Sequence, residues 1–283
     1  MSRELAPDPI VVYGSPRSGT SYLQRILNVH PEVCVTHETR VFEWLYQAVA
    51  LADDDRFVYN HRQEFAAHLR TFLPDMMRGF YRDLAPEARY WGDKNPHYAE
   101  PDNIRALDLV AELFPGSKFV HIIRDGRDVV ASLVRKRDGG KAWVSFDDAH
   151  ATWKWHVHYG RLFGQRLPPG RYFELRYEDL VADDPAMAER IFEFLGIDYH
   201  PDVDAFCRAQ FAHRSPFQDP TRDLERGAAV SDWPVVFTPE EQARSLELIG
   251  EDLTWYGYET PGSLARLRER VTTTLGSRSG AAE

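Results

Sequence analysis

The residues best suited to chemistry lie in a short loop near the N-terminus, residues 14–21, with the sequence GSPRSGTS. The loop follows an apolar, β-branched run at residues 9–14 and precedes a helical pattern at residues 19–29. In such a position, consecutive backbone N–H groups can surround an anion at the positive end of the helix dipole. Gly14 and Gly19 permit the tight path and the close approach. The loop is therefore a candidate phosphate-binding site.

The spacing of this loop resembles the Walker A motif, GxxxxGK[ST], with one departure. Thr20 stands where that motif has its lysine, and the cation of the loop is Arg17. Thr20 and Ser21 offer hydroxyl groups at the start of the helix. A kinase or NTPase needs the missing lysine on the β- and γ-phosphates, so the loop geometry fits but kinase chemistry does not. The plain alternative is a turn and helix cap that binds nothing.

A second candidate anion site follows another apolar run, residues 118–123, which predicts a buried strand. Arg124 stands at its carboxyl end, the edge where α/β sheets bind ligands. Ser132 comes eight residues later, about two helical turns onward, so Arg124 and Ser132 could hold one phosphate from two sides. The alternative is a solvated helix start, in which Arg127 and Asp128 join Arg124 in weak exposed pairs.

The elements that position these loops alternate between strand and helix, with a third strand at residues 171–176. This order predicts an α/β fold: a P-loop-type parallel sheet flanked by helices, in a single domain with a helical region at about 40–85. Residues 213–236 lack periodicity and are expected to form a long loop. Helices are expected at residues 19–29, 40–50, 61–73, 102–114, 125–137, 146–166, 185–195, 201–210, 239–250 and 263–274. We expect one domain over 1–262, then a C-terminal helix and flexible tail over 263–283.

Bulk properties restrict the partners. A chain of 283 residues with a net charge of −10 is a poor candidate for broad nucleic-acid binding, which needs a basic face. No apolar run approaches the ~18 residues of a membrane helix, and the first strand begins too early for a signal peptide. The two cysteines, Cys34 and Cys207, form neither a disulfide framework nor a CxxC pair. We therefore expect a cytoplasmic protein without a membrane partner; the sequence does not indicate its oligomeric state.

Six short motifs, in order between about residues 9 and 196, resemble the PAPS-dependent sulfotransferase superfamily, where PAPS is 3′-phosphoadenosine-5′-phosphosulfate. The closest likeness is to tyrosylprotein sulfotransferases and related bacterial sulfotransferases. Each motif alone is weak, but the ordered combination is specific. The motifs are SPRSGTSYL at 15–23, HP at 30–31, HETR at 37–40, DKNP at 93–96, RDGRD at 124–128 with Ser132, and RYEDL at 176–180.

This resemblance implies a role for each matching residue. The 5′-phosphosulfate of PAPS would be held by Arg17, Ser18, Gly19, Thr20 and Ser21, and the 3′-phosphate by Arg124 and Ser132. Tyr177 corresponds to a position near the cofactor, Glu38 to the proposed catalytic base, and Lys94 to a cation beside the transferred group. Family members close the nucleotide site with a late basic loop; its candidate here is residues 222–233, with Arg226 and Gly227.

The expected reaction is transfer of the sulfuryl group of PAPS to a hydroxyl or phenol acceptor. Sulfuryl transfer needs in-line geometry and stabilisation of spread negative charge, which Arg17 and Lys94 can supply at the leaving oxygen. Glu38 is the first candidate for the base, and His37 is the second because histidine titrates near neutral pH. Glu38 could instead serve only as a favourable negative charge at a helix start.

The acceptor is expected to be a small bacterial metabolite, with an acceptor wall in the aromatic helical region at residues 40–83, for example at Trp44 or Phe80. Two alternatives stay open: a P-loop kinase acting on a small molecule, and a non-catalytic nucleotide-binding protein.

No metal is expected from the sequence. The cluster His150, His156 and His158 invites a metal interpretation, but His156 and His158 are two apart on a helix. They are therefore turned by about 200° from each other and cannot share an ion.

Overall fold

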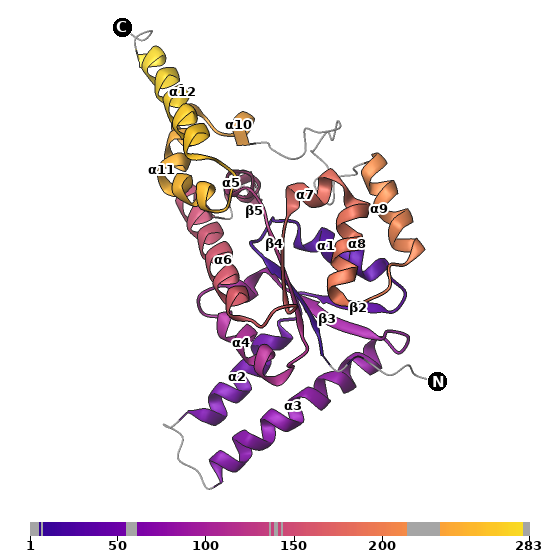
Figure 1. Cartoon of the computed structure of the whole chain (residues 1–283). Coiled ribbons are helices and arrows are strands. Elements are labelled where there is room, and N and C mark those ends of the chain that lie inside the picture. The colour runs from indigo at the N-terminus through magenta and orange to yellow at the C-terminus, as the bar shows by residue number, and fades with distance from the viewer. Residues whose placement is uncertain are drawn as a thin grey trace.

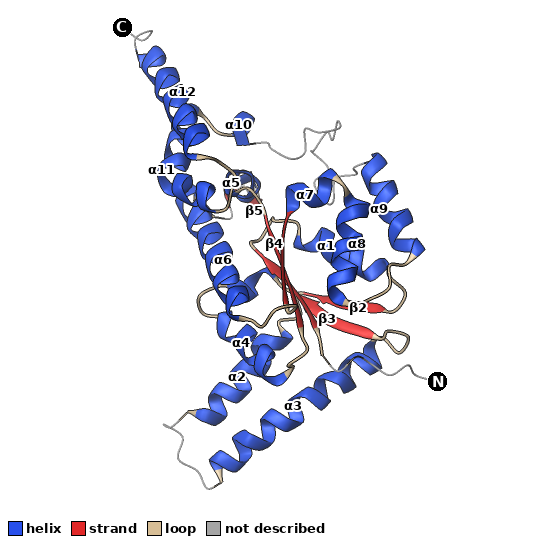
Figure 2. Ribbon diagram, in the orientation of Figure 1, coloured by secondary structure: helices blue, strands red, loops and turns tan. Residues whose placement is uncertain are grey.

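The computed structural model describes residue 6 and residues 8–54, 61–135, 137–138, 141–142, 144–213 and 233–279. Its centre is a five-stranded parallel sheet with helices on both faces (Figures 1 and 2). The strand order is β2-β3-β1-β4-β7. The strands are β1 (Ile10–Gly14), β2 (Val33–His37), β3 (Tyr90–Lys94), β4 (Lys118–Ile123) and β7 (Tyr172–Arg176). The predicted α/β, P-loop-type parallel sheet in a single domain is confirmed.

The central strand β1 explains the two helical layers. Its residues are all buried, as expected for a parallel strand covered on both faces. Ile10 and Val12 pack with α1 (Thr20–Val29), α8 (Asp184–Leu195) and α9 (Pro201–His213) on one face. Val11 and Tyr13 pack on the other face, against helices from a different part of the chain. Those helices are α2 (Val41–Asp53), α3 (Arg62–Leu84), α4 (Ile104–Leu113) and α6 (Phe146–Arg166).

A third cluster of buried residues lies beyond the end of β4. It joins Ile123 to residues of α5 (Gly126–Arg135) and α6, and to three C-terminal helices. These are α10 (Trp233–Val236), α11 (Pro239–Trp255) and α12 (Pro261–Ser279). Leu264, Leu267 and Val271 of α12 are buried in this cluster, because they fall on one face of the helix. The remaining segments are short. They are the 3₁₀ helix η1 (Pro96–Ala99), the helix α7 (Tyr177–Ala182), and the strands β5 (Arg137–Asp138) and β6 (Lys141–Ala142), which pair with each other.

Two of the five sheet strands, β2 and β3, are missing from the sequence prediction. β2 reads VCVTH and is only partly buried, so it lacks the continuous apolar run that marks β1 and β4. β3 reads YWGDK and contains Gly, Asp and Lys, which are depleted in strands. Its place between β2 and β1 is decided by pairing with both strands, and local strand propensity contains no information on such pairing.

Three predicted boundaries also need correction. α3 continues through Pro74 to Leu84, beyond the predicted end at residue 73. The region 213–236 is not a loop throughout, because α9 ends at His213 and α10 covers Trp233–Val236; residues 214–232 lie outside the described part of the chain. α12 runs from Pro261 to Ser279, longer than the predicted 263–274.

Within the described residues, no helix is both long and apolar enough for a membrane span.

Candidate active site

The sequence-predicted site residues come from five segments that meet at one edge of the sheet. The five strands are parallel, so their carboxyl ends share that edge. The loop after β1 carries residues 15–19, and the other four strands each deliver one candidate residue where they end. Glu38 follows β2, Lys94 ends β3, Arg124 follows β4 and Tyr177 follows β7. The fold thus gathers residues that are far apart in the sequence.

The loop after β1 adopts the strained path that an anion-binding turn requires. Arg17 has φ 72° and Gly19 has φ 95°, both in the left-handed region. A Cβ atom at position 19 would lie 2.5 Å from the ring of Tyr177, so glycine is needed for space as well as for conformation. Ser18 is completely buried, and its hydroxyl has no hydrogen-bond partner among the described residues. No described side chain caps α1, so its first N–H groups face the loop.

Arg124 has hydrogen-bonding capacity left over. Its guanidinium lies 4.6 Å from the centre of the Tyr177 ring, and its Nη1 donates to the carbonyl oxygen of Arg17 at 3.1 Å. The Nε and Nη2 atoms are buried and make no hydrogen bond within the described structure. An unpaired buried donor costs about 1–3 kcal/mol, a cost that a hydrogen-bond acceptor at this place would remove. The exposed-pair alternative is wrong, because Arg124, Arg127 and Asp128 are all buried.

Arg17 joins the two candidate anion sites. Its Nε donates to the hydroxyl of Ser132 at 2.9 Å, while its carbonyl accepts from Arg124. Arg17 therefore contacts both Arg124 and Ser132, the two residues expected to hold one phosphate from two sides. Both loops present cations to one region, in a chain whose overall charge is negative.

Lys94 of β3 brings an ammonium group to the loop that has threonine at position 20. Its Nζ donates to Ser21 Oγ at 3.1 Å and to Glu38 Oε1 at 2.7 Å. The Lys94 side chain is fully buried, whereas that of Glu38 is 40% exposed. Burial lowers the pKa of Lys94 despite the neighbouring carboxylate. Burial alone would raise the pKa of Glu38, but the hydrogen bond and charge of Lys94, helped by His37 and His97, outweigh it and lower that pKa.

The turn that carries Glu38 is anchored by a residue that sequence reasoning did not select, Asp93. This buried carboxylate accepts hydrogen bonds from the hydroxyls of Thr36 at 2.7 Å and Thr39 at 3.0 Å, and from Tyr98 Oη at 2.6 Å. Glu38 has φ 52°, and its backbone N–H donates to the carbonyl of Lys94 at 2.7 Å. The sequence offered one indication of this role: Asp93 is an acidic residue next to Lys94 in a segment that is otherwise buried.

His37 lies beside Glu38 but is oriented by another residue. Its Nδ1 is 2.8 Å from Gln24 Oε1, and its Nε2 is 3.6 Å from Glu38 Oε1. Both candidate bases therefore stand at the end of β2. Arg226 and Gly227, expected to close the nucleotide site, lie outside the described residues.

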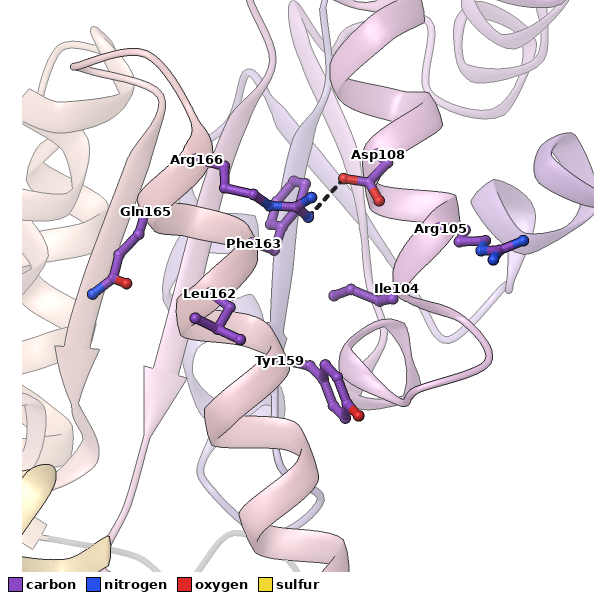
Figure 3. A pocket seen from close by; sticks show the side chains of 8 residues that line it. All are labelled: Ile104, Arg105, Asp108, Tyr159, Leu162, Phe163, Gln165 and Arg166. Atoms are coloured by element: carbon purple, nitrogen blue, oxygen red, sulfur yellow. Dashed lines mark hydrogen bonds and ion pairs between the residues drawn. The ribbon is translucent and has the colours of Figure 1, made fainter.

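A separate hollow lies between α4 and α6 (Figure 3). Tyr159, Leu162 and Phe163 line one side of it, and Arg166 pairs with Asp108 across it at 2.9 Å. None of the predicted site residues lines this hollow, so we do not assign it to the reaction.

The family model described as "Sulfotransferase family" matches residues 9–201, which is well over half of the chain. The chain therefore belongs to the sulfotransferase family. The matched region contains Arg17, Glu38, Lys94, Arg124 and Tyr177.

Curated relatives carry protein-tyrosine sulfotransferase names. A putative protein-tyrosine sulfotransferase of Caenorhabditis briggsae is 26% identical over 266 residues, covering 90% of this chain and 90% of that protein. Protein-tyrosine sulfotransferase 2 of Gallus gallus is 28% identical over 207 residues, covering 69% of this chain and 52% of the relative. The match thus spans only about half the length of that relative and of the Caenorhabditis elegans protein-tyrosine sulfotransferase A.

Solved structures share the fold. The sulfotransferase domain of the Synechococcus PCC 7002 olefin synthase aligns with a TM-score of 0.58 and 20% identity, covering 92% of this chain and 98% of that domain. Mouse sulfotransferase SULT7A1, complexed with PAP, aligns with a TM-score of 0.53 and 15% identity, covering 96% and 91% of the two chains. At these identities the likeness concerns the fold alone.

Proposed function

We propose that this sulfotransferase family member transfers the sulfuryl group of PAPS to a hydroxyl or phenol. The observation that carries the proposal is the position of Lys94. Its buried ammonium contacts Ser21 of the anion loop and Glu38, the candidate base, at the same time. One cation thus connects the place where a sulfuryl donor would lie with the place where an acceptor proton would be taken.

The residues present fit PAPS. The unpartnered Ser18 hydroxyl and the open N-terminus of α1 suit the 5′-phosphosulfate, because both offer hydrogen-bond donors to an anion. The unpartnered Nε and Nη2 of Arg124 suit the 3′-phosphate, and Ser132 would add its hydroxyl. Thr20 and Gly19 complete the first loop, and Tyr177 supports Arg124 through its ring. PAPS would supply the activated sulfuryl group, and PAP, adenosine 3′,5′-bisphosphate, would remain.

Glu38 is proposed as the general base that takes the acceptor proton. Its lowered pKa keeps it ionised at neutral pH, and its 40% exposure lets an acceptor reach it. Lys94 and Arg17 would stabilise negative charge developing on the leaving oxygen. His37 stays the second candidate, 3.6 Å away.

For the acceptor we propose a small molecule with a hydroxyl or phenol. The names of the relatives favour a phenol. Trp44 of α2 lies one turn after Arg40, the residue that precedes the helix, and is 67% exposed. Trp44 could therefore contribute to an acceptor wall. Phe80 on α3 is also exposed.

The test combines PAP calorimetry with turnover of PAPS and a set of simple phenols. Glu38→Gln should keep PAP affinity and lose about 10²–10⁴-fold in kcat, whereas Arg17→Ala should lose both affinity and turnover. Turnover at the wild-type rate in Glu38→Gln would remove Glu38 from the mechanism. PAP binding without turnover of any phenol, alcohol or tyrosyl peptide would instead favour a non-catalytic nucleotide-binding protein.

A further inference from the structure

A cluster of three potential metal ligands lies outside the residues assigned to sulfuryl transfer. His97 is the second residue of η1, Glu100 directly follows η1, and His156 stands in the middle of α6. One ligand atom from each of the three lies within 4.8 Å of the others. Glu100 Oε1 is 2.6 Å from His97 Nδ1 and 3.8 Å from His156 Nε2. Two imidazoles and a carboxylate form the ligand set of many zinc sites.

The decisive residue is His156, whose side chain is only 1% exposed. Its Nδ1 lies 2.7 Å from the carbonyl oxygen of Thr152. That oxygen can only accept, so Nδ1 carries the proton. With the proton on Nδ1, the neutral ring holds its lone pair on Nε2. That Nε2 is buried without a hydrogen-bond partner in the described structure, and it points toward Glu100.

The surroundings match those of a metal site. Metal-bound histidines typically donate their other N–H to a carbonyl, and ligating carboxylates are themselves hydrogen-bonded. Here Thr152 O fixes His156, while Asn103 Nδ2 contacts Glu100 Oε2 at 3.1 Å and the carbonyl of His97 at 3.2 Å. Asn103 therefore holds two of the three ligands in place.

The three side chains would need only small movements to bind a metal ion. Bonds of about 2.0–2.1 Å in a tetrahedron place ligand atoms roughly 3.3 Å apart. The observed 2.6 Å and 3.8 Å lie on either side of that value. His97 and Glu100 are 40% and 33% exposed, so a water molecule or a solute could occupy a fourth position.

We propose that His97, Glu100 and His156 bind one divalent transition-metal ion of the zinc class, with one coordination position open. Imidazole nitrogen and a single carboxylate favour such ions over Mg²⁺ or Ca²⁺, which prefer oxygen ligands. The site borders the proposed active site, because His97 is three residues from Lys94 in the sequence. The proposal does not depend on the sulfotransferase assignment.

The experiment is a titration of the chelator-treated, dialysed full chain with Zn²⁺ against a chromophoric chelator, and with Co²⁺ followed by visible absorption. We expect one equivalent to bind, with the intense visible bands of four-coordinate Co²⁺. His156→Gln, Glu100→Gln and His97→Asn should each weaken binding at least ~10-fold, and Asn103→Ala by about 10–100-fold, as for residues that support metal ligands. His158→Gln is the matched control, since His158 is exposed and two residues from His156 on the same helix.

Circular dichroism and PAP affinity, measured on each variant, separate loss of the metal from loss of the fold. Unchanged Zn²⁺ affinity in His156→Gln or Glu100→Gln would overturn the proposal. So would the absence of stoichiometric binding in the wild type, which would mean that a buried water molecule satisfies His156 Nε2.

Discussion

At the level of single residues, Lys94 is buried and charged at once, and its partners explain how. A buried ammonium needs compensation, which the carboxylate of Glu38 and the hydroxyl of Ser21 provide. The same hydrogen bond holds the Glu38 carboxylate in one orientation and in its ionised form. Structure and proposed chemistry therefore depend on the same contact.

Replacing Lys94 tests this dual role. Lys94→Met keeps the length of the side chain but removes the charge, so we expect kcat to fall by about 10²–10³-fold, as for loss of one charge-stabilising donor. PAP affinity should change much less. Lys154→Met is the control, because Lys154 forms a surface ion pair with Asp252 and lies on α6; steady-state kinetics of both variants provide the comparison. Equal activity in Lys94→Met and the wild type would contradict the proposed role.

The pH dependence follows from the sign of the Glu38 shift. The pKa of Glu38 is lowered in the folded protein, so the base form persists below the ordinary range of a carboxylate. We expect kcat/KM to stay constant as pH falls from neutral and to drop only below that range. The stabilisation from the Glu38–Lys94 pair should likewise be present above the unfolded-state pKa and disappear as pH falls through the folded-state value.

In Lys94→Met the acidic limb of the kcat/KM profile should move to higher pH, because burial then acts on Glu38 without the compensating charge. A profile that is identical in the two proteins would show that Glu38 does not control the limb.

At the level of elements, the turn between β1 and α1 combines two requirements at Gly19: a positive φ and space against Tyr177. Tyr177 in turn lies against Arg124. A side chain at position 19 would therefore disturb both proposed anion sites through one ring.

Gly19→Ala should accordingly weaken PAP binding as well as stability. Gly170→Ala is a matched control, because Gly170 has φ 82° and no described heavy atom lies within 4 Å of the place where a Cβ would stand. The backbone strain, of order 1–3 kcal/mol, is common to both variants, so denaturant melts should show both destabilised and calorimetry should show PAP affinity lost only in Gly19→Ala. Equal PAP affinities in Gly19→Ala and Gly170→Ala would show that the loop at Gly19 does not contribute to nucleotide binding.

The turn after β2, which carries Glu38, is held in place by hydrogen bonds to Asp93 of β3. Asp93→Asn keeps the shape of the side chain but changes an oxygen acceptor into a donor that faces the hydroxyls of Thr36, Thr39 or Tyr98. We expect a loss of about 1–3 kcal/mol in the free energy of unfolding and a lower kcat with PAP affinity retained. Lower PAP affinity with an unchanged kcat would place the effect of Asp93 in the nucleotide site instead.

At the level of the whole molecule, the sheet brings two loops more than 100 residues apart into contact through Arg17. A ligand that spans both loops should stabilise the whole domain. At 100 times its Kd, PAP should add about 2.7 kcal/mol to the free energy of unfolding and raise Tm. Arg124→Ala should abolish most of that rise in Tm. Adenosine 5′-phosphate lacks the 3′-phosphate, so the rise in Tm that it causes should differ much less between the wild type and Arg124→Ala. An undiminished PAP-induced shift in Arg124→Ala would contradict the two-site arrangement.

The sequence by itself determined the elements and motifs that depend only on neighbouring residues. The glycine-rich loop at residues 14–21, the buried run before Arg124 and the helix at 146–166 all have local patterns, and the structure has the corresponding elements. The motif order also led to the sulfotransferase family, which the family match confirms. These features depend on neighbouring residues, so a linear pattern is enough to predict them.

Only the tertiary structure decided which distant residues touch. β3 has weak strand propensity and was not predicted, yet its Lys94 contacts both Ser21 and Glu38. Its Asp93 accepts a hydrogen bond from Thr36, next to the turn that carries Glu38. His156 does face away from His158, as its spacing implies, but it meets His97 and Glu100 from another segment. The physical reason is that parallel strand pairing and helix packing join segments through long-range contacts, and no local sequence pattern carries that information.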